Sequence, residues 1–214
     1  MNMFDFPKAT QVDLKVPKKT FYENLTVSSM DKKLFVEQLT AIYWRYKLTA
    51  DNLKVSGGDI NEIEIFELQL SKKEFSKDIL KLIDKGIPYQ TVFVVNFGEQ
   101  GQLWIAHKEI SSDGTVKLGT YYNSEWVDNN WISLSLKGLS IEAIYKNFFY
   151  QIVPELSACE TKSIADILSD YERNTKLQKE ITRLEKLAKK EKQPKKKFEI
   201  VQKINQLKKV FAEG

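Results

Sequence analysis

The sequence is poor in the residues that most often form covalent links, metal sites and nucleotide cradles. Among 214 residues there is one cysteine, Cys159, and one histidine, His107. A single cysteine cannot form a disulfide within the chain, which suits a reducing compartment. One histidine without a cysteine cluster cannot complete a zinc site. The glycines form neither a Walker loop nor a G-x-G-x-x-G motif, so the standard nucleotide cradles have no support. We expect His107 to have a structural or surface role and Cys159 to be a buried or inert thiol.

Long apolar runs are also missing. The longest, such as Thr91 to Val95, are far shorter than the ~20 residues needed to span a bilayer. Met1 to Lys8 contains no apolar stretch of the kind found in a secretory signal. We therefore expect a cytoplasmic protein without a membrane partner. The chain is nevertheless 42% hydrophobic and 12% aromatic, which allows a sizeable core and excludes global disorder.

The net positive charge comes from the C-terminal quarter of the chain. The chain has 33 Lys and Arg against 29 Asp and Glu, a net charge of +4. Residues 161–214 hold 15 basic and 8 acidic residues, which is +7, so residues 1–160 hold 18 and 21, which is −3. A basic segment can meet nucleic acid or an acidic protein surface. It can equally be a solvated helical face that keeps the protein soluble.

The first seventy residues contain one strand pattern, one helix pattern and a second strand pattern. Residues near Val12 to Val16 favour a short edge strand. A helix capped by Ser28 or Ser29 is then predicted to end near Leu48. Its apolar stripe is Phe35, Leu39, Ile42 and Tyr46, at spacings of four, three and four. Residues 62–70 predict a strand that is either buried on both faces or interrupted by a bulge, because the phase of its apolar residues shifts near the middle.

The next eighty residues predict the rest of a mixed sheet. Ser71 and Glu74 match a capping box ahead of a helix that ends at Gly86. Strands are then predicted at Tyr89 to Phe97, Leu103 to Ile110, Thr115 to Tyr122 and Trp131 to Leu136, with turns at Gly98 to Gly101 and at Asp113-Gly114. A helix capped by Ser140 and stopped by Pro154 follows. This order predicts an α/β (α+β) fold, in which helices pack on a mixed sheet that contains a meander.

Two matched stripes predict an antiparallel helical hairpin at the C-terminus. They are Leu177, Ile181, Leu184 and Ala188, and then Ile200, Ile204, Leu207 and Phe211. Pro194 suits the first position of the second helix. We therefore divide the chain into an α/β globular body (1–158), a connector (159–173) and a basic helical hairpin or short coiled coil (174–214). The arms are short, so we expect the hairpin to dock on the body, on a second copy or on a partner.

The strongest enzymatic interpretation is a divalent-metal-dependent nuclease. Glu67 to Gln69 lie on a predicted strand that is followed by a helix and a hydrophobic strand, and this order resembles the restriction-endonuclease-like core over residues 59–97. The resemblance implies that Asp59 and Glu67 hold a cation such as Mg²⁺, which activates water. Gln69 replaces the lysine of the acidic-x-lysine motif. The alternative is that the glutamates form the solvated edge of a half-buried strand. No other residues suggest a cofactor or metal, and the balance is against an enzyme.

Six lysines around the hairpin turn are candidates for contacts with nucleic-acid phosphates. They are Lys189, Lys190, Lys192, Lys195, Lys196 and Lys197. About six such contacts would give strong salt dependence without reading sequence, because released counterions supply the free energy of binding. The alternative is a solvated turn. The aromatic residues to test for exposure in a protein interface are Phe66, Trp104, Trp126 and Trp131.

Several short segments, spread over nearly the whole chain, have the pattern of a known family. They include Phe6 to Thr10, Trp44-x-Tyr46-Lys47-Leu48, Leu82 to Tyr89, Tyr122-x-x-Glu125-Trp126 and Glu191 to Gln193. In these segments the chain resembles an uncharacterised bacterial family, domain of unknown function 4391. At the hairpin tip, Pro194 and Lys195 depart from the pattern expected of that family.

The resemblance implies a setting and supplies no catalytic residues. Members of the family are typically encoded beside a helicase and a DNA methyltransferase, in clusters that look like restriction or anti-phage defence systems. We therefore interpret the chain as an accessory, non-catalytic protein that binds such a helicase or methyltransferase through its body and hairpin, and DNA through the lysine-rich tip. The alternatives are the metal-dependent nuclease and a homo-oligomerisation module, in which two hairpins pair into a four-helix bundle.

Overall fold

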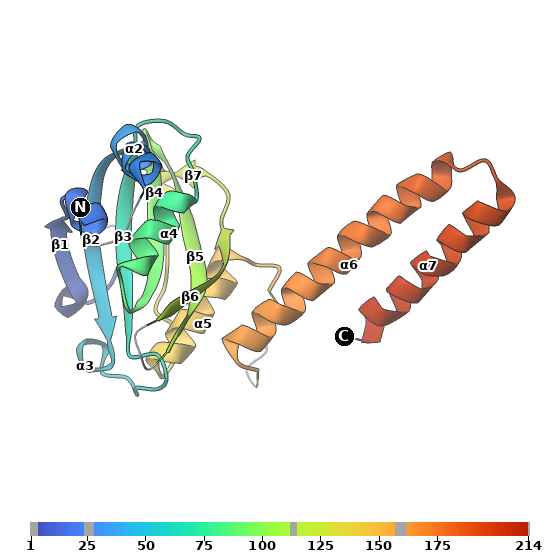
Figure 1. Ribbon diagram of the computed structural model, residues 1–214. Coiled ribbons are helices and arrows are strands. Elements are labelled where there is room, and N and C mark those ends of the chain that lie inside the picture. The colour runs from blue at the N-terminus through green and yellow to red at the C-terminus, as the bar shows by residue number, and fades with distance from the viewer. Residues whose placement is uncertain (1–3, 24–27, 112–114, 157–161, 214) are drawn as a thin grey trace. The chain divides into compact units, whose positions relative to one another are not determined.

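A seven-stranded mixed sheet forms the centre of the first of two compact units, Met1–Glu155 and Leu156–Gly214. The computed structural model describes residues 4–23, 28–111, 115–156 and 162–213 (Figure 1). The fold is the predicted α+β body with a C-terminal helical pair. Within the described residues, no helix is both long and apolar enough to cross a membrane.

The order of the sheet is β1-β2-β3-β4-β5-β6, and β7 pairs with one end of β5. The strands β3 and β4 run parallel, and the other described pairs are antiparallel. The predicted meander is therefore confirmed in β4, β5 and β6. The bounds are β1 (Gln11–Lys15), β2 (Leu39–Thr49), β3 (Glu62–Leu70), β4 (Gln90–Phe97), β5 (Gln100–Ile110), β6 (Val116–Asn123) and β7 (Val127–Asp128). The predicted turn at Asp113-Gly114 lies outside the described residues.

Helices cover both faces of this sheet (Figure 1). One face packs against α1 (Lys19–Glu23), α2 (Ser29–Gln38) and α4 (Asp78–Lys85), around a core that includes Phe35, Phe66 and Phe93. The other face meets α5 (Ile141–Ile152), which begins after the predicted cap Ser140. The remaining short elements are η1 (Lys8–Thr10), α3 (Ala50–Leu53) and η2 (Asn129–Trp131).

The predicted helix from Ser28 to Leu48 is wrong in its second half. Its start is confirmed, because Ser28 and Asp31 form a reciprocal capping box. The helix ends at Gln38, however, and β2 begins at Leu39. A register shift in β2 between Trp44 and Tyr46 puts an extra residue into the strand. A bulge of this kind moves later side chains to the opposite face, so the apolar spacing imitates a helical period.

Two further local predictions are corrected. The capping box at Ser71 and Glu74 does not form, because α4 begins only at Asp78, where the hydroxyl of Ser76 accepts a bond from the Asp78 amide at 3.2 Å. The strand predicted from Trp131 to Leu136 is also absent: β7 is shorter and earlier, and η2 follows it. In β3, by contrast, burial on both faces is confirmed, and its register with β4 is unbroken.

The second unit contains the predicted hairpin. Its helices are α6 (Ile164–Lys190) and α7 (Pro194–Glu213), which lie side by side (Figure 1). Pro194 is the first residue of α7, as the sequence indicated. The hairpin core consists of Ile181, Leu184, Ala188 and Ile204, with Ile200 and Leu207 packed against it. The helix α6 begins ten residues before the expected hairpin boundary at residue 174, so much of the connector is helical.

Candidate functional site

Glu67, on β3, lies in a row of charged and amide side chains that runs across the sheet from β1 to β4. Its side chain is only 4% exposed. Arg45 Nε donates to Glu67 Oε2 at 2.5 Å, and Arg45 Nη1 donates to Asp13 Oδ1 at 3.0 Å. The other carboxylate oxygen, Glu67 Oε1, accepts from Asn96 Nδ2 at 2.9 Å and from the amide of Gln69. Both oxygens of this carboxylate therefore accept from side chains of the described chain, those of Arg45, Asn96 and Gln69.

Two irregularities in neighbouring strands create this row. Arg45 is the extra residue at the register shift of β2, and Asp13 lies within the register shift of β1 at a φ of 49°. Bulges re-aim side chains, and here they direct Arg45 toward both carboxylates. Burial lowers the pKa of the Arg45 guanidinium, but the bonds to Glu67 and Asp13 outweigh it and raise that pKa overall.

The residues of the nuclease hypothesis are only partly brought together. Gln69 contacts Glu67, but Asp59 is exposed and precedes β3, in which Glu67 is the sixth residue. At about 3.3 Å per residue, the intervening chain is extended for most of its length, so the two carboxylates lie far apart. In the part of the chain that the structure describes, no group of three or more His, Cys, Asp or Glu could hold a metal. A cation at Glu67 would have to displace Arg45.

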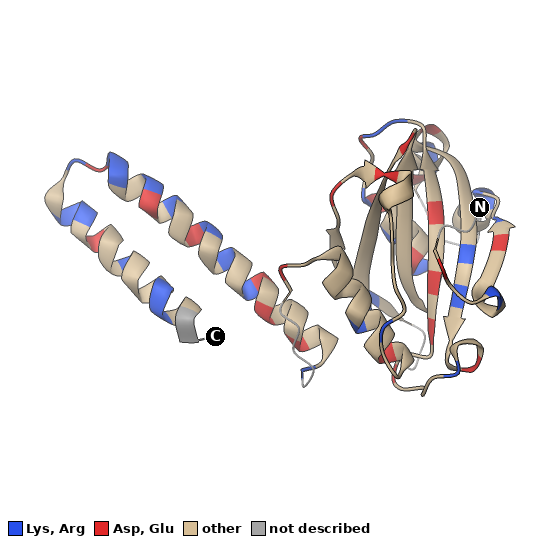
Figure 2. Ribbon diagram, turned by 180° about the vertical axis from the view of Figure 1, so that it is seen from behind, with Lys and Arg blue, Asp and Glu red and all other residues tan. Residues whose placement is uncertain are grey.

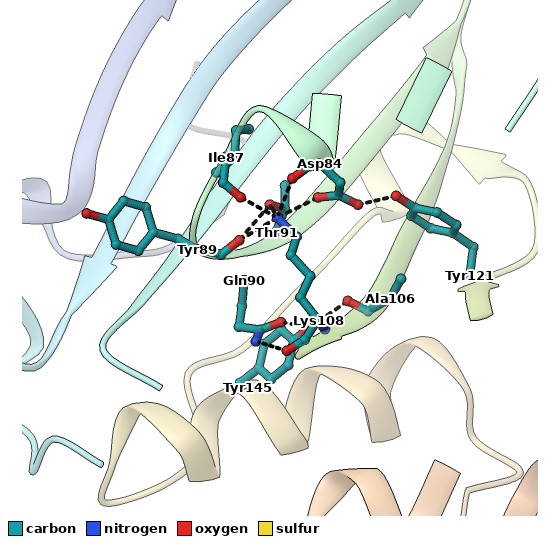
Figure 3. Close-up of polar contacts among 9 residues, drawn as sticks. All are labelled: Asp84, Ile87, Tyr89, Gln90, Thr91, Ala106, Lys108, Tyr121 and Tyr145. Atoms are coloured by element: carbon teal, nitrogen blue, oxygen red, sulfur yellow. Dashed lines mark hydrogen bonds and ion pairs between the residues drawn. The ribbon is translucent and has the colours of Figure 1, made fainter. Parts of the chain in front are cut away.

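A second polar cluster, which the sequence did not predict, surrounds the buried Lys108 on β5 (Figure 3). Its ammonium forms an ion pair with Asp84 Oδ1 at 2.8 Å, and the two side chains are 0% and 1% exposed. It also donates to the main-chain oxygens of Asp84 (3.4 Å), Ile87 (3.1 Å) and Tyr89, and to the Thr91 hydroxyl at 2.7 Å. Lys108 thus holds the end of α4 and the loop that leads into β4 against the sheet.

Burial and ion pairing oppose one another in this cluster. Burial lowers the pKa of Lys108, and the Asp84 carboxylate resists that change. Burial also raises the pKa of Asp84, against the pull of Lys108 and of the Tyr121 hydroxyl that donates to it. Two of the atoms around Nζ, the main-chain oxygens of Ile87 and Tyr89, can only accept, so Lys108 acts as the donor to them. The enclosed cluster thus links α4 and the start of β4 to β5.

Two carboxyl groups, Glu62 and Glu64, lie near one another on β3. Lys47 on β2 forms an ion pair with Glu62 at 2.9 Å, and both glutamates are buried. Burial and the neighbouring Glu62 raise the pKa of Glu64 to about 8. The oxygen Glu62 Oε1 is buried and has no hydrogen-bond partner among the described residues. We infer that Glu64 carries a proton that it shares with the neighbouring Glu62 carboxylate, because burial and that neighbour both raise the pKa of Glu64.

The free energy of unfolding should therefore decrease as the pH rises, and part of this decrease should depend on Glu64. The folded protein binds this proton with a pKa of about 8, above the ordinary 4.5. The stabilisation is thus complete below the unfolded value and is lost as the pH rises through 8. Between about pH 6 and pH 9, the free energy of unfolding of Glu64→Gln should decrease by about 1–2 kcal/mol less than that of the wild type. Thermal unfolding at both pH values measures this, with the exposed Glu74→Gln as control. Identical pH slopes for Glu64→Gln and wild type would contradict the shared proton.

Segments of Lys and Arg, drawn in blue, lie on both helices near the hairpin turn (Figure 2). All six of the predicted lysines are exposed. They are Lys189 and Lys190 at the end of α6, Lys192 in the turn, and Lys195, Lys196 and Lys197 at the start of α7. Within the described residues, none of the six forms an ion pair within 4.0 Å. The carboxylates of the hairpin pair instead with other cations: Glu185 with Lys208 at 2.7 Å and Glu180 with Arg183 at 2.7 Å.

The four aromatic residues proposed for an interface differ in their exposure to solvent. Phe66 and Trp104 are buried in the core, and Trp126 is half-buried against it. Trp131 in η2 is 79% exposed. His107 is half-buried on β5, where burial lowers its pKa. Cys159 lies outside the described residues.

Comparison with known proteins places the whole of this architecture in one family model. The model is described as Domain of unknown function (DUF4391), and it matches residues 4–210. The match therefore covers both the body and the hairpin. No curated protein and no solved structure matches the chain.

Proposed function

The chain belongs to the DUF4391 family, and from that premise we propose that it is an accessory, non-catalytic protein that binds DNA through the lysine-rich tip of its hairpin. The observation that carries the proposal is the set of six exposed tip lysines, none of which has an ion-pair partner among the described residues. Unpaired ammonium groups on an exposed turn can approach phosphates without first breaking internal contacts.

The arrangement of charge favours nucleic acid over a simple solvated turn. Farther along the helices, Glu185 is paired with Lys208 and Glu180 with Arg183, whereas Glu191 and Glu199 are the two acidic residues near the six tip lysines. The surplus of positive charge is therefore left at the tip (Figure 2). A compact group of cations at the turn of a helical hairpin suits contacts to neighbouring phosphates, which position a protein on DNA without reading its sequence.

The proposal of a non-catalytic role has support from the Glu67 row and the Lys108 cluster. Glu67 is occupied by Arg45, Gln69 and Asn96. Lys108 and Asp84 are enclosed and paired with one another, and Lys108 also donates to Ile87 and Thr91. A substrate or a metal would have to displace these partners, so both groups are better explained by stability than by chemistry.

Removing three tip lysines should weaken DNA binding strongly and change its salt dependence. About six phosphate contacts give a slope of log K against log salt near −5, and each lost contact reduces it by about 0.9. The variant Lys195→Ala/Lys196→Ala/Lys197→Ala should therefore have a slope shallower by about 2–3, and about 10- to 100-fold weaker binding at low salt. Fluorescence anisotropy with a labelled duplex over a salt series measures both quantities.

A matched control removes the same charge from the body. Lys15, Lys72 and Lys137 are exposed there, and their triple replacement by Ala lowers the net charge equally. We expect this control to keep the slope of the wild type, because long-range charge alone does not release counterions at a contact. Equal slopes for the wild type and both triple variants would remove the tip from DNA binding.

The accessory role would be exercised beside a helicase or a DNA methyltransferase, as the family resemblance implies. The exposed Trp131 on the body favours a protein partner, since tryptophan is enriched among residues that dominate interface energies. Co-purification of the full chain with each of these enzymes, expressed from the same gene cluster, tests this part. Failure of both to associate would leave a DNA-binding protein without the accessory role.

A further inference from the structure

An exposed aromatic ring lies directly beside the tip lysines. Phe198 on α7 follows Lys195, Lys196 and Lys197 in sequence and is 62% exposed. It belongs neither to the hairpin core nor to the residues packed against that core. Val201, one helical turn farther, is also 39% exposed. The basic tip is therefore flanked by an apolar surface that the hairpin itself does not cover.

The ion pair between Glu185 and Lys208 marks one flank of the hairpin. On α7, Phe198, Val201 and Lys208 lie on one stripe of the helix, because they are separated by three and seven residues. On α6, Lys189 is four residues after Glu185 and so lies one turn farther along the same flank. The pKa of Glu185 supports this placement, since it is lowered first by Lys208 and also by Lys189.

We propose that this flank binds single-stranded nucleic acid. An unpaired base would stack on Phe198, and the adjoining phosphates would contact Lys189 and the other tip lysines. Proteins that bind single strands combine cations that follow the backbone with aromatic rings that stack the bases. Every base has a π-face, so one exposed phenylalanine suffices for a contact that ignores sequence. In a duplex the base faces are already stacked on one another, so no face is free to stack on the ring of Phe198.

This inference rests on the proposed function, because it names the form of nucleic acid that the tip lysines would hold. It adds one requirement, that the ring contributes to binding of a single strand and leaves binding of a duplex unchanged. The lysines alone would bind both forms, with the denser charge of the duplex favoured.

The test compares two labelled probes, an oligothymidine of about 15 nucleotides and a duplex of equal length. Phe198→Ala should weaken binding of the single strand about tenfold and leave the duplex unchanged. Phe198→Leu keeps an apolar side chain without a ring and should lose as much, whereas Phe198→Trp should bind the single strand at least as tightly as wild type. Leu187→Ala, which removes a 44% exposed apolar residue from α6, is the control and should bind both probes normally.

The outcomes separate this inference from the proposal on which it rests. If Phe198→Ala or Phe198→Leu binds the single strand as tightly as wild type, stacking is overturned while the lysine tip stands. Equal losses on both probes would also overturn it, because the ring would then support the hairpin and not a base. If the wild type binds neither probe, the inference and the proposed function fail together.

Discussion

Lys108→Met is expected to lower the free energy of unfolding of the body by about 3–5 kcal/mol, because it leaves a buried carboxylate without its cation. The lost ammonium contacts Asp84 at 2.8 Å and holds the carbonyl oxygen of Ile87 and the hydroxyl of Thr91. Those acceptors would remain buried without a donor, which adds to the cost. Urea denaturation followed by tryptophan fluorescence measures the effect, since all four tryptophans lie in the body.

Two comparisons show whether the buried pair is responsible. Lys117→Met removes an exposed lysine, whose pair with Glu109 has side chains 76% and 59% exposed, and should cost less than about 1 kcal/mol. Asp84→Asn should also destabilise, and the double variant Asp84→Asn/Lys108→Met should lose less than the sum of the two single changes, because each single change leaves the other charge unpaired. A loss for Lys108→Met no larger than that for Lys117→Met would show that the cluster does not stabilise the fold.

The burial of Lys108 is a feature that the sequence could not have revealed. In the sequence it stands between His107 and Glu109, and lysine is almost never fully buried. Its partners come from the end of α4 and from β4, between 17 and 24 residues away. Local patterns predict which residues form a strand, but they do not show which distant carboxylate will neutralise a buried charge. That information lies in the tertiary packing.

The continuity of the apolar period explains why the hairpin was predicted correctly and the helix from Ser28 to Leu48 was not. The hairpin of α6 and α7 was predicted because each apolar stripe keeps its period without interruption, as in Ile200, Ile204 and Leu207. The stripe from Phe35 to Tyr46 has the same spacing but joins the end of α2 to a bulged strand. Periodicity therefore predicts an element reliably only where the backbone is regular over the whole pattern.

The same bulge explains why the candidate site was only half predicted. Glu67 and Gln69 were identified from their positions on one strand, and they do contact one another. Arg45 had no sequence signal, because it reaches Glu67 only as the extra residue of β2. Without that cation, Glu67 looked available to a metal. With it, the carboxylate is part of an ion-paired row that ends at Asp13.

Glu67→Ala should consequently behave as a structural change, with a loss of about 2–4 kcal/mol in the free energy of unfolding. The replacement leaves the exposed Asp13 as the remaining carboxylate paired with Arg45, and it removes the acceptor of Asn96 Nδ2, whose bond is 2.9 Å long. Glu67→Gln keeps the shape of the side chain and should cost less. Mg²⁺ should not raise the melting temperature of the wild type, because Arg45 already supplies the positive charge.

A metal-dependent nuclease would respond in the opposite way. Catalytic carboxylates held close together repel one another, so removing one preserves or raises stability while abolishing cleavage. Thermal unfolding with and without Mg²⁺, together with a plasmid cleavage assay on the same samples, distinguishes the two cases. If Glu67→Ala is as stable as the wild type and eliminates a Mg²⁺-dependent cleavage that the wild type performs, the carboxylate is catalytic and Arg45 must move aside to admit the metal. If Glu67→Ala is destabilised and Mg²⁺ has no effect on the wild type, Glu67 stabilises the centre of the sheet, and nucleic-acid chemistry is left to a partner.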